Sequence, residues 1–152
     1  MIPRSNPPVI IDTNVFDNKD IIRWLWEYRG DKIIPSVVYM ELAVIHLART
    51  GNLGKLDAML RSAGIEIRNF DLHHAHNCAG FIKDDRLVKE KWKDAMIASY
   101  AATPPFILIT NNVRDFVSLL GNRAMPPYEF KKAVEEGRLQ EYLDAEESDN
   151  IE

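Results

Sequence analysis

Two aspartates follow short apolar runs of the sequence. Asp12 follows Val9–Ile11, and Asp115 follows Phe106–Ile109 after a polar turn. Continuous apolar runs this short and rich in β-branched residues are typical of strands buried on both faces of a parallel sheet. Ligands of such sheets bind beyond the carboxyl ends of the strands. We therefore expect both aspartates at the sheet edge that holds a ligand.

Two further acids lie within helical patterns. Glu41 follows Val37 by four residues and precedes Val44 by three, which places it on the apolar side of a predicted helix. Asp94 precedes small alanines at one-turn and two-turn spacings, which allow close approach to a neighbouring element. A carboxylate among apolar neighbours is buried only when it is paired or bound to a cation. Both acids are therefore candidates for a shared site.

The chemistry of four converging carboxylates is specific. They repel one another and raise one another's pKa unless a cation lies between them. Oxygen ligands suit Mg²⁺ or Mn²⁺, and Mg²⁺ usually combines few protein carboxylates with waters and substrate phosphates. Such an ion activates water and stabilises charge on a phosphate. The set favours metal-dependent phosphodiester hydrolysis, whereas no Ser or Cys with a suitably spaced His indicates a nucleophile.

Strand and helix patterns alternate along the chain. Strands are predicted at 9–11, 33–34, 65–67 and 106–109, and helices at 21–28, 37–47, 53–61, 72–82, 84–102, 116–120 and 127–134. Ser36 is predicted to cap the second helix. The alternation predicts an α/β fold, a three-layer α/β/α sandwich with a mostly parallel central sheet.

Four motifs in this order resemble those of the PIN-domain nucleases, and especially their VapC toxin branch. The motifs are VIIDTN at 9–14, EL at 41–42, DAMIA at 94–98 and TNNVRDF at 110–116, and the resemblance covers about Val9 to Phe130. Each motif alone is weak, whereas four in matching order and spacing are specific. The resemblance implies a single PIN-like nuclease domain at 1–134, with 135–152 as an acidic C-terminal segment of the same domain.

The resemblance also implies roles for individual residues. The acidic quartet that holds one or two Mg²⁺ or Mn²⁺ ions corresponds to Asp12, Glu41, Asp94 and Asp115. Polar residues in supporting positions are Thr13 and Asn14 beside the first aspartate, and Thr110 and Asn112 ahead of the last. The number of ions stays open, as does whether Asp115 or Asn112 contacts the metal directly.

The resemblance further implies partners. Family members cleave single-stranded or looped RNA through a metal-activated water, and many toxin members are homodimers that a small antitoxin inhibits. A standalone RNA-processing PIN nuclease is the alternative role. Trp24 and Trp26 lie two residues apart in a predicted helix, so one of them is expected to be exposed at a dimer or antitoxin contact.

Basic residues gather ahead of Asp94. They are Lys83, Arg86, Lys89, Lys91 and Lys93. We hypothesise that Arg86 and Lys93, together with Arg114 beside Asp115, contact the RNA backbone. The alternative for these residues is a solvated helix face with local ion pairs.

A second group of residues has metal-ligand chemistry but no matching spacing. His73, His74, His76 and Cys78 offer the nitrogen and sulfur ligands of zinc, yet their spacing fits no standard zinc module. We therefore expect surface histidines on a helix whose apolar side holds Leu72, Ala75 and Ala79. Cys78 is expected to be a small core residue.

The composition is that of one globular domain. The chain has 152 residues and a net charge of −4, yet 135–152 hold eight acids and one base, which leaves 1–134 with 18 bases and 15 acids. The single cysteine excludes an internal disulfide. No apolar run is long enough to span a membrane, and the first residues lack the apolar region of a secretory signal. A cytoplasmic protein is therefore expected.

Two other function classes remain open at this point. A non-catalytic PIN-like interaction module would be marked by loss of an acid, whereas all four acids are present. An aspartyl-phosphate phosphatase of haloacid-dehalogenase type also has an aspartate after its first strand. That family requires Asp-x-Asp, and the third position here is Asn14.

Overall fold

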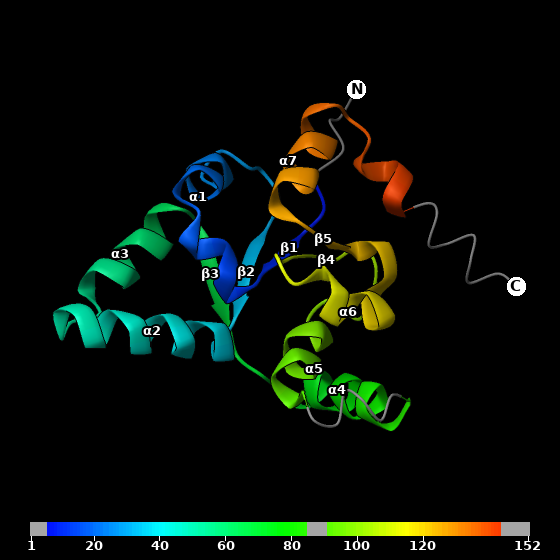
Figure 1. Cartoon of the computed structure of the whole chain (residues 1–152), viewed down its shortest axis with the longest axis horizontal. Helices are drawn as coiled ribbons and strands as arrows, with labels where there is room; N and C mark the ends of the chain where they lie inside the picture. Colours follow the sequence, from blue (N-terminus) through cyan, green and yellow to red (C-terminus); the bar gives the residue numbers. More distant parts are fainter. Residues whose placement is uncertain (1–5, 85–90, 144–152) are drawn as a thin grey trace, which may run out of the picture.

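The centre of the protein is a sheet of five parallel strands. The computed structural model describes residues 6–84 and 91–143 (Figure 1). The strands are β1 (Val9–Ile11), β2 (Lys32–Pro35), β3 (Ile65–Arg68), β4 (Ile107–Ile109) and β5 (Ala124–Met125). They follow the order β3-β2-β1-β4-β5, and every neighbouring pair is parallel.

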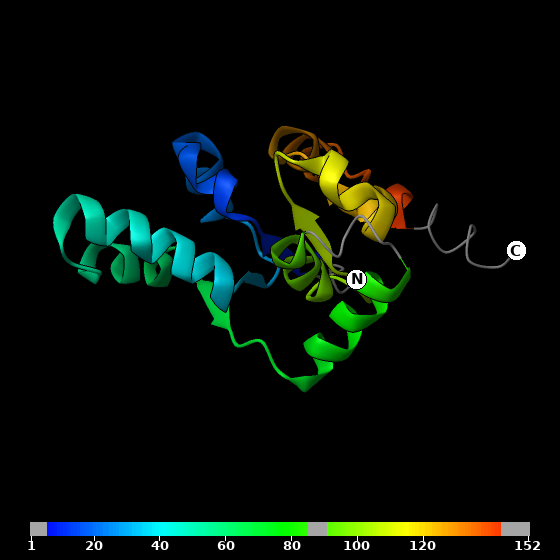
Figure 2. The same cartoon turned by 60° about the horizontal axis from the view of Figure 1, so that its bottom comes forward.

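Helices flank this sheet. The α-helices are α1 (Lys19–Leu25), α2 (Ser36–Thr50), α3 (Gly54–Ser62), α4 (Leu72–Asp84), α5 (Trp92–Ser99), α6 (Val113–Leu120) and α7 (Pro127–Glu135), and the 3-10 helices are η1 (Thr13–Asp17) and η3 (Gly121–Arg123). In Figures 1 and 2, α1 and α7 lie on one side of the sheet and α4 on the other. The α/β class and the parallel central sheet predicted from the sequence are confirmed.

Strands β1 and β4 lie at the centre of the hydrophobic core. All three residues of each strand have no exposed surface. Burial on both faces explains why these strands are continuous apolar runs rather than alternating ones. The chain continues from β1 to β2 and β3 on one side, and it returns to β4 and β5 on the other. The carboxyl ends of β1 and β4 therefore form the topological switch point of the sheet, where ligands bind in open α/β folds.

Several predicted boundaries were wrong. β5 was not predicted, because two residues carry no periodic pattern; its pairing with Leu108 and Ile109 defines it. The helix predicted at 84–102 is shorter: α5 ends at Ser99, Asp84 closes α4, and 85–90 lie outside the described residues. Ser36 does not cap α2, because Pro35 occupies that position and Ser36 is the first helical residue.

The buried side of α4 also differs from the prediction. Leu72 is 72% exposed, whereas His74 and Cys78, one turn apart, are buried. The His74 ring stacks on Tyr100 with centroids 4.0 Å apart, and its Nδ1 accepts a hydrogen bond from the backbone N–H of Asp71. Stacking and hydrogen bonding therefore place a histidine, rather than the leucine, against the core. Cys78 is a small core residue, as predicted.

The described part of the acidic C-terminal segment packs on the domain. Leu139 is buried, and Tyr142 and Leu143 are partly buried against the same core. The segment beyond residue 143 lies outside the described residues. Within 6–84 and 91–143, no helix combines the length and the apolar character that crossing a membrane requires.

The buried histidine predicts a pH-dependent stability. Burial lowers the pKa of His74 below its ordinary value of 6.5, so the unfolded chain binds a proton more readily and acidification below that pH favours unfolding. His74→Phe keeps the stacking and removes the titration. We expect the Tm of wild type to fall further than the Tm of His74→Phe when the pH is lowered from 7 to 5.

Thermal unfolding followed by circular dichroism measures this difference. His76→Phe is the matched control, because His76 lies exposed on the same helix. It should keep the wild-type pH dependence. Parallel Tm curves for wild type and His74→Phe would contradict the prediction.

Candidate functional site

Asp12 lies at the carboxyl end of β1, where it begins η1. Its backbone N–H donates to the carbonyl of Ile109 at 3.0 Å, which extends the β1–β4 ladder by one residue. Three hydrogen bonds hold its side chain, and the residue is only 6% exposed. Thr13 N–H donates to Oδ1 at 2.7 Å, and the Thr110 hydroxyl and the Asn14 amide donate to Oδ2 at 2.8 and 3.3 Å. Asp12 is thus a fixed carboxylate at the switch point.

The environment of Asp12 opposes its negative charge. Burial raises the pKa of this carboxyl most, and the nearby Glu41 carboxylate raises it further. The hydrogen bonds from Thr110 and Thr13 and the positive charge of Lys93 act in the opposite direction. A buried carboxylate that faces another carboxylate gains stability from an additional cation.

Glu41 is linked to Asp12 through Thr13. The Thr13 hydroxyl donates to Glu41 Oε1 at 2.9 Å, while the backbone N–H of the same threonine binds Asp12. The expected apolar surroundings of Glu41 are not found: its side chain is 27% exposed, and Val44 is 61% exposed. The buried residues of α2 are instead Val38, Leu42 and Ala43. Glu41 therefore lies at the solvent boundary of the site.

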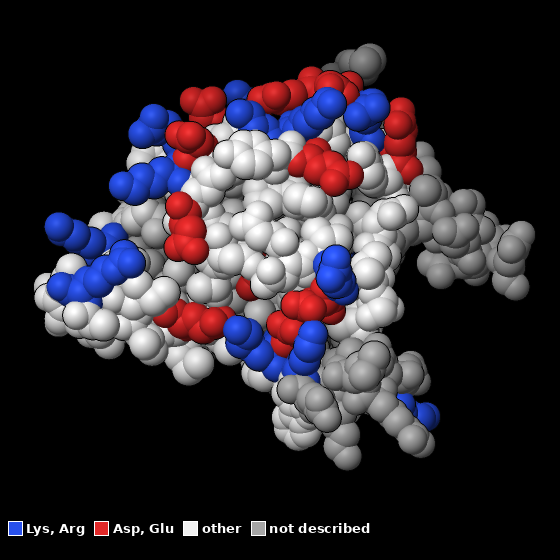
Figure 3. Space-filling view, in the orientation of Figure 1, with Lys and Arg blue, Asp and Glu red and all other residues white. Residues whose placement is uncertain are grey.

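Asp94 and Asp115 lie in the first turns of α5 and α6. Burial raises the pKa of Asp94 most, followed by the negative charges of Asp115 and Asp12. These interactions place the acids within electrostatic reach of one another. Figure 3 shows acidic side chains bordered by basic ones in the area between α2, α5 and α6.

Two lysines contact the acids of this area. Lys93 Nζ lies 3.1 Å from Glu41 Oε2, and Lys91 Nζ lies 2.9 Å from Asp115 Oδ1. Lys93 was a predicted RNA contact. Lys91 was predicted only as one of a basic group, because an i, i+2 spacing of lysines on either side of Trp92 does not indicate which acids they reach.

The four acids gather but do not form a preassembled metal cage. Among the described residues, no three His, Cys, Asp or Glu side chains are placed to hold one metal ion, which also leaves the zinc alternative at α4 unsupported. The oxygen donors of Asp12 and Asp94 have the chemistry that Mg²⁺ and Mn²⁺ require, and Mg²⁺ commonly uses one or two carboxylates with waters. The site residues therefore fit such an ion chemically, and the ion itself stays a prediction.

The polar residues beyond β4 organise the edge of the site. Asn112 N–H donates to the Thr110 hydroxyl at 3.0 Å. Asn111, which was not predicted as a site residue, donates through its backbone N–H to Asn14 Oδ1 at 3.1 Å. The family resemblance indicated Asn112 alone, and the polar turn itself carries no signal that would select Asn111. Arg114 is exposed in the first turn of α6, whereas Arg86 lies outside the described residues.

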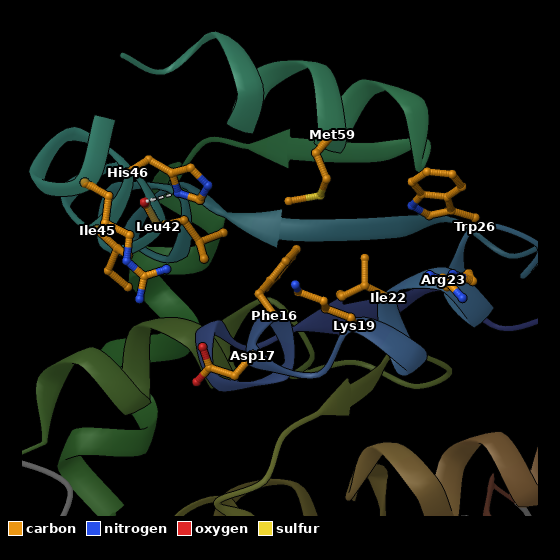
Figure 4. A pocket seen from close by; sticks show the side chains of 11 residues that line it. Phe16, Asp17, Lys19, Ile22, Arg23, Trp26, Leu42, Ile45, His46 and Met59 are labelled. Carbon is orange, nitrogen blue, oxygen red and sulfur yellow. Dashed lines mark hydrogen bonds between the residues drawn. The ribbon is translucent and has the colours of Figure 1, made fainter. Parts of the chain in front are cut away.

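A groove lies beside the site between η1, α1, α2 and α3. It has a volume of about 410 Å³. Figure 4 shows Phe16 and Ile22 on one side of it and Met59 on the other. Three cations line the same groove, namely Lys19, Arg23 and Arg49, together with the acid Asp17.

The two tryptophans near this groove differ in exposure. Trp26, in the groove lining, is 51% exposed, whereas Trp24 packs against Tyr28 and Phe130. The expectation of one exposed tryptophan is confirmed.

Comparison with known proteins identifies the fold. No protein-family model and no curated protein matches the sequence. The protein is similar to a chain of a solved structure described as a toxin-antitoxin complex from Klebsiella pneumoniae, with a TM-score of 0.57 and 21% sequence identity. The similarity covers 74% of this chain and 93% of that chain. At this identity the similarity establishes a shared α/β fold.

The Thr110 hydroxyl predicts a measurable contribution to stability. Thr110→Val removes a buried donor to the Asp12 carboxylate, and a lost hydrogen bond to a charged group costs about 2 kcal/mol. We expect the Tm to fall by about 4–8 °C. Thr110→Ser retains the hydroxyl and should lose less than half as much. Equal losses for the two variants would show that the methyl group, rather than the hydroxyl, is important.

Proposed function

We propose that this protein is a metal-dependent endoribonuclease that hydrolyses RNA phosphodiester bonds. The observation that supports this proposal is the buried Asp12 carboxylate at the β1–β4 switch point, where the charge of Glu41 raises the pKa of Asp12 and the charge of Asp12 raises the pKa of Asp94. A bound Mg²⁺ or Mn²⁺ would supply an activated water and neutralise charge on the phosphate.

The chain's own residues would then divide the work. Asp12 and Asp94 would hold the ion, and Glu41 and Asp115, at the solvent boundary, would orient its waters. Thr13, Asn14 and Thr110 fix the Asp12 carboxylate by direct hydrogen bonds. Asn112 supports Thr110 from the next turn. Arg114 and Lys93, both exposed at this edge, would contact the RNA backbone.

We further propose a toxin role with an antitoxin partner. The PIN and VapC resemblance of the four motifs and the fold shared with a chain of a toxin-antitoxin complex support this role. A homodimer belongs to the same proposal. A standalone RNA-processing nuclease would use the same residues without the partner.

The groove between α1, α2 and α3 is the proposed antitoxin surface. Its apolar floor suits the apolar side of an amphipathic helix, and its Lys19, Arg23 and Arg49 suit acidic residues at the edges of that helix. Exposed tryptophans at such grooves contribute large shares of binding energy. We therefore assign the groove to an amphipathic helix with acidic flanks.

Loss of one acid should separate folding from activity. Asp94→Asn removes a negative charge that burial and neighbouring acids disfavour, so the fold should be kept while RNA cleavage falls by at least about a hundredfold. Cleavage of labelled single-stranded RNA with Mg²⁺, Mn²⁺ or EDTA measures this effect. Asp20→Asn, an exposed acid of α1, is the control and should cleave normally. Wild-type cleavage by Asp94→Asn, or full cleavage in EDTA, would refute the proposed chemistry.

The groove assignment predicts two partner-binding defects. Trp26→Ala should weaken binding of the protein encoded by a neighbouring short reading frame by at least about tenfold, because it removes an exposed anchor. Arg23→Glu should weaken it most at low salt, because the charge is reversed. Trp92→Ala is the control, since Trp92 is 60% exposed but lies outside the groove. Calorimetry on purified proteins measures all three, and unchanged affinity of Trp26→Ala would place the partner elsewhere.

A further inference from the structure

Two lysine ammonium groups lie where the acidic site would otherwise carry uncompensated charge. Lys91 contacts Asp115 and Lys93 contacts Glu41, at 2.9 and 3.1 Å. Both lysine side chains are 54% exposed, and the acids that they contact are 34% and 27% exposed. The pairs are therefore open to exchange with solvent ions.

The two lysines are close in the sequence to one of the four acids. They flank Trp92 immediately before Asp94, so one backbone segment carries two cations and one of the four acids. Lys93 also interacts electrostatically with Asp12 and Asp94, and Lys91 with Asp94.

We propose that Lys91 and Lys93 are exchangeable counter-cations of the acidic site, which hold Asp115 and Glu41 until a divalent ion takes over that role. This inference rests on the proposed function. Exposed ion pairs are weak and screened by salt, so a divalent ion can displace the ammonium groups. The lysines thus compete with the ion rather than assist its binding.

The competition makes a prediction that is opposite to a purely structural role. If the lysines compete, their removal tightens ion binding. If they only brace α5 against α2 and α6, removal loosens the fold and leaves ion binding unchanged or weaker. Lys91→Met and Lys93→Met keep most of the apolar side-chain length and remove the charge, so they separate these roles.

The test is calorimetric titration of the full chain with Mn²⁺ alone, at constant ionic strength. We expect Lys91→Met/Lys93→Met to bind Mn²⁺ at least about fivefold more tightly than wild type. Lys91→Arg/Lys93→Arg keeps both charges and should remain within about twofold of wild type. Arg114→Met is the matched control, since Arg114 lies on the same surface and forms no ion pair with a described residue. It should also remain within about twofold.

The outcomes separate this inference from the proposed function. If wild type binds Mn²⁺ and the double Met variant binds it equally tightly or more weakly, the counter-cation role is overturned. The nuclease proposal is left standing by that result. Equal tightening by Arg114→Met also overturns it, because general surface charge would then explain the effect. No Mn²⁺ binding by wild type or by either double variant overturns both. Circular dichroism on each variant confirms that the compared proteins are folded.

Discussion

Burial of one carboxylate at the end of the central strand constrains the rest of the site. Asp12 is almost wholly removed from water, so its charge must be satisfied by the protein. Thr13 N–H and the Thr110 hydroxyl bind its two oxygens, and both come from residues directly beyond β1 and β4. The adjacency of these two strands therefore does more than build the core. It supplies the hydrogen bonds without which the carboxylate could not remain at this depth.

The remaining acids approach from separate helices, and each stays partly in contact with solvent. Glu41 comes from α2, Asp94 from α5 and Asp115 from α6. This arrangement limits the repulsion, because water and the lysines screen the acids that lie further out, while Asp12 is fixed by hydrogen bonds. Negative charge is thus graded from a rigid interior position at Asp12 to partly exposed positions on the three helices.

The sequence predicted the parts of the molecule that local patterns determine. The buried strands predicted at 9–11 and 106–109 placed Asp12 and Asp115 at the carboxyl edge of the sheet, whereas Thr110 was indicated only by the family resemblance. It could not predict β5, which exists only through its pairing with β4. It also misjudged α4, where stacking of His74 on Tyr100 depends on a distant residue. The partners of Lys91 and Lys93 lie 24 and 52 residues away in the chain, beyond any local pattern.

One turn of α2 serves two surfaces. Glu41 contacts Thr13 at the acidic site, and the next residue, Leu42, lines the groove. A substitution at Leu42 therefore acts directly beside the residue that contacts the acidic site. For the proposed partner, changes of preference are therefore expected at groove residues further from Glu41 in the sequence, such as Arg49 on α2 and Met59 on α3.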